Sequence, residues 1–145
     1  MTDTIPPIPN RQRTIDADHL NLLSIFHFVG AGLALLGMMF LLLHFTLFHT
    51  FMENPAMWRN QGPPPPPAQF FAIFKVFYLV FGMWLAASFV LNLLSGFFLR
   101  GRSHRAFSLV VGAVNCLHVP LGTVLGVFTI VVLMRESVRG IYGEG

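Results

Sequence analysis

Three histidines, His27, His44 and His118, lie within long apolar stretches, where an imidazole could ligate iron or carry a proton. A haem b held by two histidines needs both rings at one depth on facing helices. At 1.5 Å per helical residue, counted from one common side of the helices, the three rings lie at about 10, 36 and 20 Å. We therefore predict no cofactor. The alternative is haem b bound between two copies, through pairs of His27 or of His44.

The other chemistry that the sequence offers is copper binding or catalysis. His44, His49, Met52 and Met57 are ligand types that copper accepts, but their spacing fits no defined motif, and we expect no metal site. The sequence shows no paired nucleophile and base, no pair of acids and no phosphate-binding loop. We therefore expect no enzymatic activity.

The composition indicates a membrane protein. Of the 145 residues, 54% are hydrophobic and only 10% are charged, and the mean hydropathy is +0.67. Three stretches, 20–52, 70–99 and 106–134, carry no charged residue except Lys75. About 20 apolar residues cross the hydrocarbon of a bilayer, and each stretch is longer. The fold class that we predict is an all-α integral membrane protein, a bundle of three long transmembrane helices with lipid around it.

The third stretch contains a helix breaker, Pro120, in the sequence NCLHVPLGTVLG. Proline cannot donate to the carbonyl of Cys116, so that carbonyl needs another donor, for which Thr123 and Asn92 are candidates. We expect a single crossing, kinked or broken at Pro120. Four helices, or a re-entrant hairpin that turns back at PLGT, are the alternatives.

The basic residues indicate the topology. Arg100, Arg102 and Arg105 lie in one short loop, which the positive-inside rule places in the cytoplasm together with the N-terminus. The net charge of +3 is explained by this orientation, and we expect no nucleic acid partner. The side on which the tail lies stays open. One membrane domain, 1–145, is expected, with a polar segment 1–19, helix 20–52 (starting near Ala17), a proline-rich loop 53–69 with a stiff spacer at 63–67, helix 70–99, a basic loop 100–105, helix 106–134 and a tail 135–145.

Polar side chains inside the apolar stretches indicate which faces contact protein, because lipid offers them no hydrogen bonds. Counted from the cytoplasmic side, His27, Asn92 and Asn115 lie at about 10, 12 and 15 Å. We therefore predict one polar layer shared by three helices. A proton or ion path through such groups would require several copies, because three helices do not enclose a pore.

Small residues recur at four-residue spacing in the same stretches, a pattern that lets helices approach closely in lipid. Together with the amides and the proline motif, they are the predicted packing residues: Gly30, Ala34, Gly37, Gly82, Ala86, Asn92, Gly96, Asn115, Pro120, Gly122, Thr123 and Gly126.

Two motifs, LLSIFHFVGAGLALLG and CLHVPLGTVLGVFTIVVLMRESV, resemble those of a group of small bacterial inner-membrane proteins that have no established activity. The shared features are an L-x-I-F-H opening and a C-terminal P-x-G-T-x-L-G box. His27, His44 and Pro120 match this pattern, as do Gly122, Thr123 and Gly126, whereas His118 does not. The resemblance implies a bacterial inner membrane.

These observations favour a non-enzymatic structural or accessory membrane subunit that assembles with copies of itself or within a larger membrane complex. The alternative is a haem-binding, metal-binding or ion-conducting membrane protein that uses His27 and His44.

Overall fold

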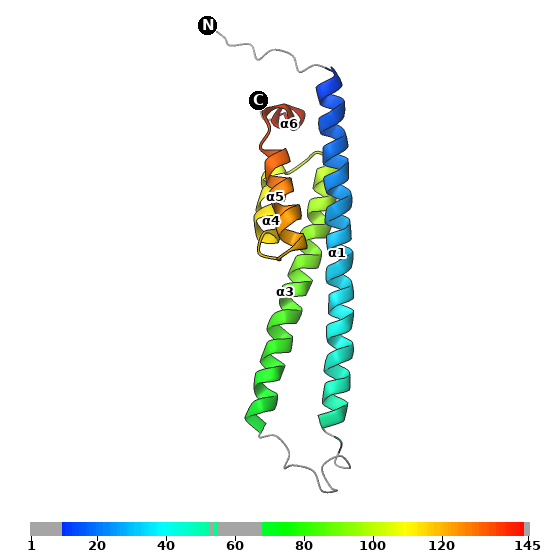
Figure 1. Cartoon of the computed structure of the whole chain (residues 1–145), viewed down its shortest axis with the longest axis vertical. Helices are drawn as coiled ribbons and strands as arrows, with labels where there is room; N and C mark the ends of the chain where they lie inside the picture. The colour runs from blue at the N-terminus through cyan, green and yellow to red at the C-terminus, as the bar shows by residue number, and fades with distance from the viewer. Residues whose placement is uncertain (1–9, 53, 55–67, 144–145) are drawn as a thin grey trace. The chain divides into compact units, whose positions relative to one another are not determined.

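Two long helices, α1 (Asn10–Met52) and α3 (Ala68–Arg100), dominate the structure, a computed structural model that describes residues 10–52, 54 and 68–143 (Figure 1). Neither helix contains a proline, whereas Pro9 and Pro67 immediately precede them. The described residues form helices and no strands. Residues 1–9 of the predicted polar segment, residues 53 and 55–67 of the predicted 53–69 loop with its proline run, and residues 144–145 of the tail lie outside the described part.

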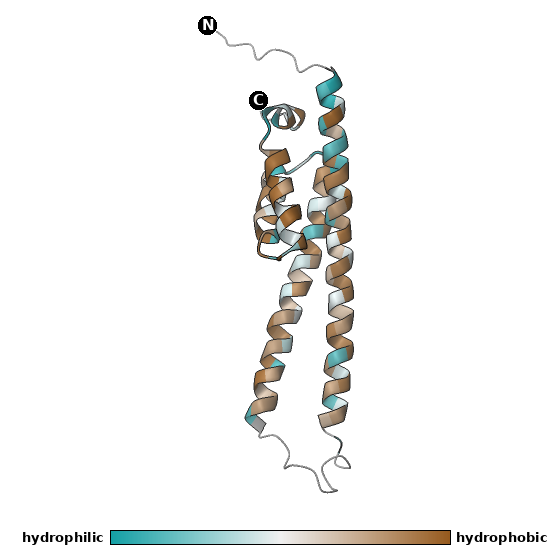
Figure 2. Cartoon of the chain, in the orientation of Figure 1, coloured by the Kyte–Doolittle hydropathy of each residue, from teal (hydrophilic) through white to brown (hydrophobic). Residues whose placement is uncertain are grey.

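Both long helices are apolar enough to cross a membrane (Figure 2). In their most apolar windows only 17% of the residues of α1 and 6% of those of α3 are buried. The core helix of a water-soluble protein buries much of its apolar surface, and these helices leave theirs open. Their outer faces are therefore of the kind that lipid covers.

The start of α1 differs from our expectation of a helix beginning near Ala17. The helix begins at Asn10, so Asp16 lies inside it. Asp16 is fully buried, accepts a hydrogen bond from Gln12 Nε2 at 3.2 Å and lies 3.8 Å from Arg135 Nη1. These partners stabilise a carboxylate within the helix, which the local sequence alone does not indicate.

The third apolar stretch forms two helices in place of the single helix 106–134 that we expected. α4 (Arg105–Asn115) and α5 (Leu121–Leu133) are antiparallel and pack on each other, which is the hairpin alternative. A further short helix, α6 (Glu136–Ile141), occupies the expected tail. The stretch that reads as one crossing in the sequence is therefore folded back on itself.

The turn between α4 and α5 has hydrogen-bond partners within the chain. Pro120 lies at the N-terminal end of α5, after a cis peptide bond. The Thr123 hydroxyl donates to the carbonyl of Cys116 at 2.9 Å, and the amide of His118 donates to the carbonyl of Asn115. Thr123 is thus the donor that the exposed carbonyl requires, whereas Asn92 bonds elsewhere.

By their contacts the residues divide into two units, 32–89 and the combination of 1–31 with 90–145. We call the second combination the hairpin unit and 32–89 the helix-pair unit. The hairpin unit has an apolar cluster drawn from α1, α3, α5 and α6. Its buried members are Leu20, Leu23, Leu99, Val132, Leu133 and Val138.

Close backbone approach joins α4 to α5. A β-carbon on Gly126 would collide with the carbonyl oxygen of Gly112 and lie 2.6 Å from Cys116 Sγ. A β-carbon on Gly112 would lie 3.3 Å from the carbonyl oxygen of Gly126. The two helices can lie this close only because both positions lack a side chain.

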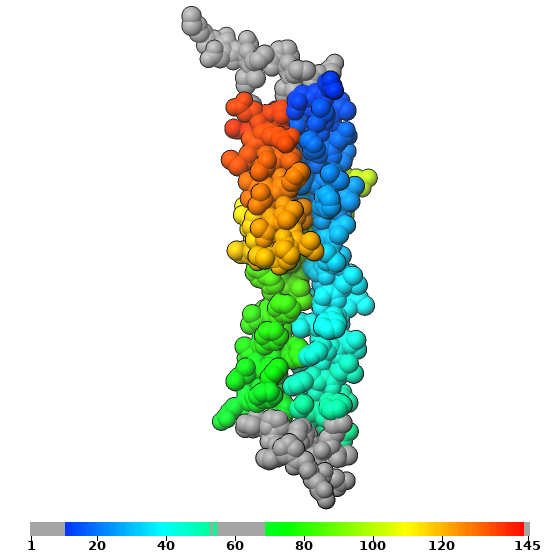
Figure 3. Space-filling view, viewed as in Figure 1, coloured from blue at the N-terminus to red at the C-terminus, as the bar shows by residue number. Residues whose placement is uncertain are grey.

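The end of the chain returns to the start of α1 within the hairpin unit. Figure 3 shows the C-terminal residues, orange to red, against the first turns of α1, in blue. Arg135 contacts Asp16 and also donates to His19 Nδ1 at 3.3 Å. Arg105 Nε donates to the carbonyl of Leu133 at 2.8 Å, which satisfies a carbonyl at the C-terminal end of α5.

The helix-pair unit consists of the second half of α1 and the first part of α3. The His44 ring bonds through Nδ1 to the hydroxyl of Tyr78 at 2.6 Å. Around this bond lie aromatic contacts, including stacked Phe48 and Phe74 with ring centres 5.1 Å apart. Polar and aromatic side chains together therefore align the two helices here.

Replacing Gly126 by alanine should lower the free energy of unfolding by about 1–3 kcal/mol, because the added carbon meets backbone atoms that cannot move aside cheaply. A denaturation titration in detergent measures this change. Gly32 is the matched control on α1, since nothing lies within 4 Å of its added β-carbon. Gly32→Ala should leave stability unchanged or raise it by less than about 1 kcal/mol. Equal effects of the two variants would contradict the close approach.

Candidate functional site

The hairpin unit encloses a network of four polar side chains, one from each of four helices. His27 on α1 bonds through Nδ1 to Asn92 Oδ1 on α3 at 3.0 Å, and through Nε2 to Thr129 Oγ1 on α5 at 3.1 Å. Asn92 and Asn115 of α4 form a reciprocal amide pair. The Asn92 amide donates at 3.1 Å and the Asn115 amide at 2.8 Å. We call these four residues the His27 network.

The network is closed to its surroundings. His27 and Thr129 are 0% exposed, and Asn92 and Asn115 are 5% and 4% exposed. On α1 the buried residues Leu20, Ser24 and His27 recur every three or four positions, so they share one helical face. The Ser24 hydroxyl also donates from this face, to the carbonyl of Gly96 at 2.8 Å. Helical periodicity thus directs the polar groups inward, as the matched depths predict.

A neutral His27 imidazole can make these hydrogen bonds in two ways, which differ in the ring nitrogen that carries the hydrogen. In one, Nδ1–H donates to Asn92 Oδ1 and the Thr129 hydroxyl donates to Nε2. In the other, both amides are rotated, so that the Asn92 amide nitrogen donates to Nδ1 and Nε2–H donates to Thr129. The Thr129 hydroxyl then donates to the carbonyl of Leu125, which lies 2.8 Å away. Neither way leaves a ring nitrogen without a partner.

This arrangement bears on the haem alternative. An iron ligand needs a ring nitrogen with a free lone pair, and both nitrogens of His27 contact side chains of its own chain. His118 lies in the turn between α4 and α5 and is half-buried, while His44 belongs to the helix-pair unit. Among the residues that the structure describes, no three His, Cys, Asp or Glu side chains lie together in a way that could hold a metal ion.

Most of the predicted packing glycines contact atoms of their own unit. In the hairpin unit, a β-carbon on Gly30 would lie 3.4 Å from Asn92 Oδ1, and one on Gly96 would lie 2.7 Å from the Phe28 ring. A β-carbon on Gly122 would collide with His118 and lie 2.6 Å from the carbonyl oxygen of Asn115. Small residues thus make room for the Phe28 ring and for the hairpin turn, whose Pro120 is exposed.

The other packing candidates belong to the helix-pair unit. A β-carbon on Gly37 would lie 3.4 Å from Leu85, and one on Gly82 would lie 3.5 Å from Leu41. Ala34 is buried and Ala86 is half-buried. These glycines face side chains of the other long helix within one chain, at distances where an added β-carbon would make ordinary van der Waals contact.

Two hydrogen-bond partners of histidines, Thr129 for His27 and Tyr78 for His44, have no distinctive pattern around them in the sequence. Thr129 is a lone hydroxyl in an apolar run, and its only local signal is that it follows Gly126 by three positions and so shares its helical face. Tyr78, the partner of His44, reads as one aromatic residue among many. Each pairing joins residues at least 34 positions apart, so no local pattern reports it.

Comparison with known proteins places the chain in no group. No protein-family model, no curated protein and no solved structure matches it.

Replacing Asn92 by leucine should destabilise the protein by about 1–3 kcal/mol, because it leaves Asn115 and one nitrogen of His27 buried without partners. Asn115→Leu should cost a similar amount. The double variant should cost less than the two single changes added together, because it removes both amides at once. Unfolding titrations of the four proteins in detergent measure this coupling.

Thr46→Val is the matched control for these variants. Its hydroxyl is exposed and donates to the carbonyl of Leu42 in its own helix, so a small change is expected. Strictly additive effects of Asn92→Leu and Asn115→Leu would contradict the paired amides.

Proposed function

We propose that this chain is a multi-pass protein of a bacterial cytoplasmic membrane, acting without catalysis as a structural or accessory subunit. The observation that carries the proposal is the inverted distribution of polarity. Large apolar side chains cover the outside of α1 and α3, while the fully enclosed positions of the hairpin unit include His27, Ser95 and Thr129. Lipid can cover the apolar side chains on the outside, and it requires that polar side chains be enclosed by protein. The bacterial assignment follows from the motif resemblance alone.

The arginines support an orientation with the N-terminus in the cytoplasm. In the hairpin unit they flank the start of α1, the loop after α3 and the helix α6. They are Arg11, Arg13, Arg100, Arg102, Arg105, Arg135 and Arg139. The two remaining basic residues besides histidine, Arg59 and Lys75, lie in the 32–89 part of the sequence. The positive-inside rule then places both ends of the chain in the cytoplasm.

In this topology α1 and α3 cross the membrane, and the α4–α5 hairpin enters and leaves on the cytoplasmic side. The 11 residues of α4 and the 13 of α5 extend about 17 and 20 Å, short of the roughly 30 Å of hydrocarbon. The His27 network is then shielded by protein, as polar groups at membrane depth require.

Assembly with other membrane chains would use the helix-pair unit. The glycines that suggested an assembly face are engaged inside the chain, so they leave the exposed apolar faces for partners. His44 is exposed on such a face, and its one hydrogen bond to a described residue uses Nδ1, toward Tyr78. An imidazole in contact with acyl chains is costly, so its second nitrogen favours a neighbouring protein, a further copy or a larger complex.

The topology can be tested with reporters. A fluorescent protein fused after Gly145 should be active, and alkaline phosphatase at the same position inactive, because the first folds in the cytoplasm and the second only outside it. The same two reporters inserted in the 53–69 loop should give the reverse pattern and serve as the control. An active phosphatase after Gly145 would mean that the third stretch crosses the membrane.

Assembly can be tested by mass. In detergent and in liposomes the protein should exceed the 16.2 kDa of one chain, and His44→Leu should shift it toward the monomer by removing the polar contact. Leu43→Met, at the neighbouring exposed position, is the matched control and should leave the mass unchanged. A wild-type protein that is monomeric in liposomes, counted by single-molecule photobleaching, would refute assembly with itself.

A further inference from the structure

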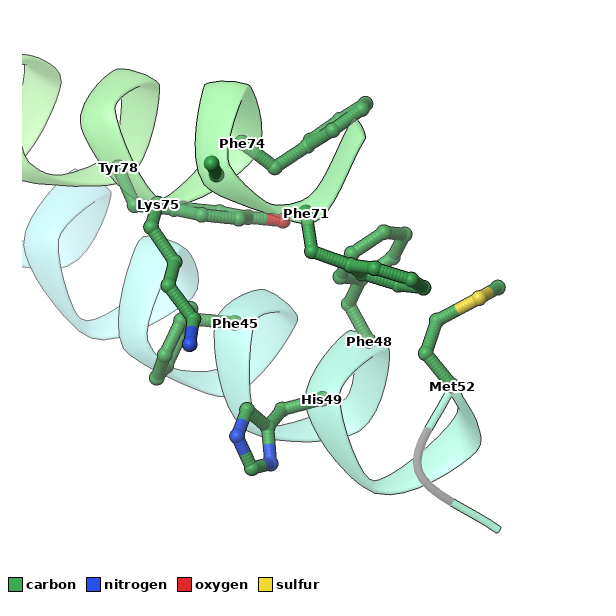
Figure 4. Close-up of a pocket in the computed structure, with 9 residues that line it drawn as sticks. Phe45, Phe48, His49, Met52, Phe71, Phe74, Lys75 and Tyr78 are labelled. Carbon is green, nitrogen blue, oxygen red and sulfur yellow. The ribbon is translucent and has the colours of Figure 1, made fainter. Parts of the chain in front are cut away.

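An aromatic groove of about 350 Å³ lies in the helix-pair unit, between the end of α1 and the start of α3. Its walls include Phe45 and Phe48 from α1 and Phe71 from α3 (Figure 4). Phe45 meets the Tyr78 ring edge-on with ring centres 5.1 Å apart, and Phe48 stacks on Phe74, which fixes both walls. The groove therefore offers an apolar ligand a surface that is already formed.

One charged side chain belongs to this groove. Lys75 is exposed on α3, and Figure 4 shows it running along the groove with its nitrogen on the side of Phe45 and His49. The described residues of the helix-pair unit include no Asp or Glu, and the structure gives Lys75 no ion pair with any described residue. A cation beside so much apolar surface is stabilised by an anion.

The position of Lys75 along α3 matches the level of lipid headgroups. The 33 residues of α3 extend about 50 Å, so a helix centred in the membrane has about 10 Å beyond the hydrocarbon at each end. Lys75 lies seven residues, or about 10 Å, from the start of the helix at Ala68. Its ammonium group is thus at the boundary where phosphates lie, while the aromatic wall borders the acyl chains.

We propose that this groove binds an anionic phospholipid, with the headgroup phosphate on Lys75 and an acyl chain against the aromatic wall. Charge complementarity favours this occupant over a partner helix, which would cover the ammonium group with apolar side chains. The apolar walls favour a lipid over free phosphate. The inference rests on the proposed membrane location, because only there are the groove and Lys75 presented to lipid.

The test is lipid retention by the full-length protein in nanodiscs made from equal parts of phosphatidylglycerol and phosphatidylcholine. After release into detergent, native mass spectrometry should show about fivefold enrichment of phosphatidylglycerol among the bound lipids, the effect of one lysine near an anionic surface. Lys75→Gln should abolish the enrichment, and Lys75→Arg should keep it. Arg102→Gln, which removes a cation from the loop of the hairpin unit, is the matched control and should keep it too.

Several outcomes would overturn the inference. Equal retention of the two lipids by the wild type is one, and unchanged enrichment in Lys75→Gln is another. Binding of inorganic phosphate that depends on Lys75 in phosphatidylcholine nanodiscs, without enrichment of phosphatidylglycerol, would assign the cation to free phosphate. Phosphatidylglycerol enrichment that appears only in the Glu53→Gln variant would identify Glu53 as the counterion of Lys75 in the wild type. A protein that fails to enter nanodiscs would instead refute the membrane location itself.

Discussion

The structure depends on a simple constraint: a polar side chain enclosed by apolar surface must find its hydrogen-bond partners within the protein. His27 presents two ring nitrogens on an apolar helix, and Asn92 and Thr129, from two other helices, occupy both. Asn115 completes the arrangement from a fourth helix by pairing with Asn92. These hydrogen bonds fix each helix in its rotation about its own axis and in its position along that axis. Apolar packing alone does not achieve this, because it is non-directional.

The glycines make this network geometrically possible. α4 and α5 approach closely at Gly112 and Gly126, and this contact brings Asn115 and Thr129 to the same site from opposite directions along the chain. The turn at Pro120 reverses the chain, and Thr123 satisfies the carbonyl left open there. Small residues, which in the sequence suggest close contact between helices, and a helix breaker together serve the folding of a single chain here.

Part of the fold and of the site was predictable because it depends on local properties. The apolar run 70–99 predicts α3 to within two residues at each end, and the matched depths of His27, Asn92 and Asn115 predict that they meet. The early start of α1 was not predictable, since Asp16 lies inside the helix through its contact with Arg135, far along the chain. The role of Thr129 was hidden for the same reason.

The amino-acid pattern alone established the all-helical class, the two helices long and apolar enough for a membrane, and the polar faces that turn inward. These follow from hydrophobicity and from the 3.6-residue period, both of which are properties of neighbouring residues. Tertiary contacts decided that the third apolar stretch turns back as a hairpin. The same local sequence is compatible with a kinked helix and with a hairpin. The choice between them depends on the distant partners that the buried polar groups find.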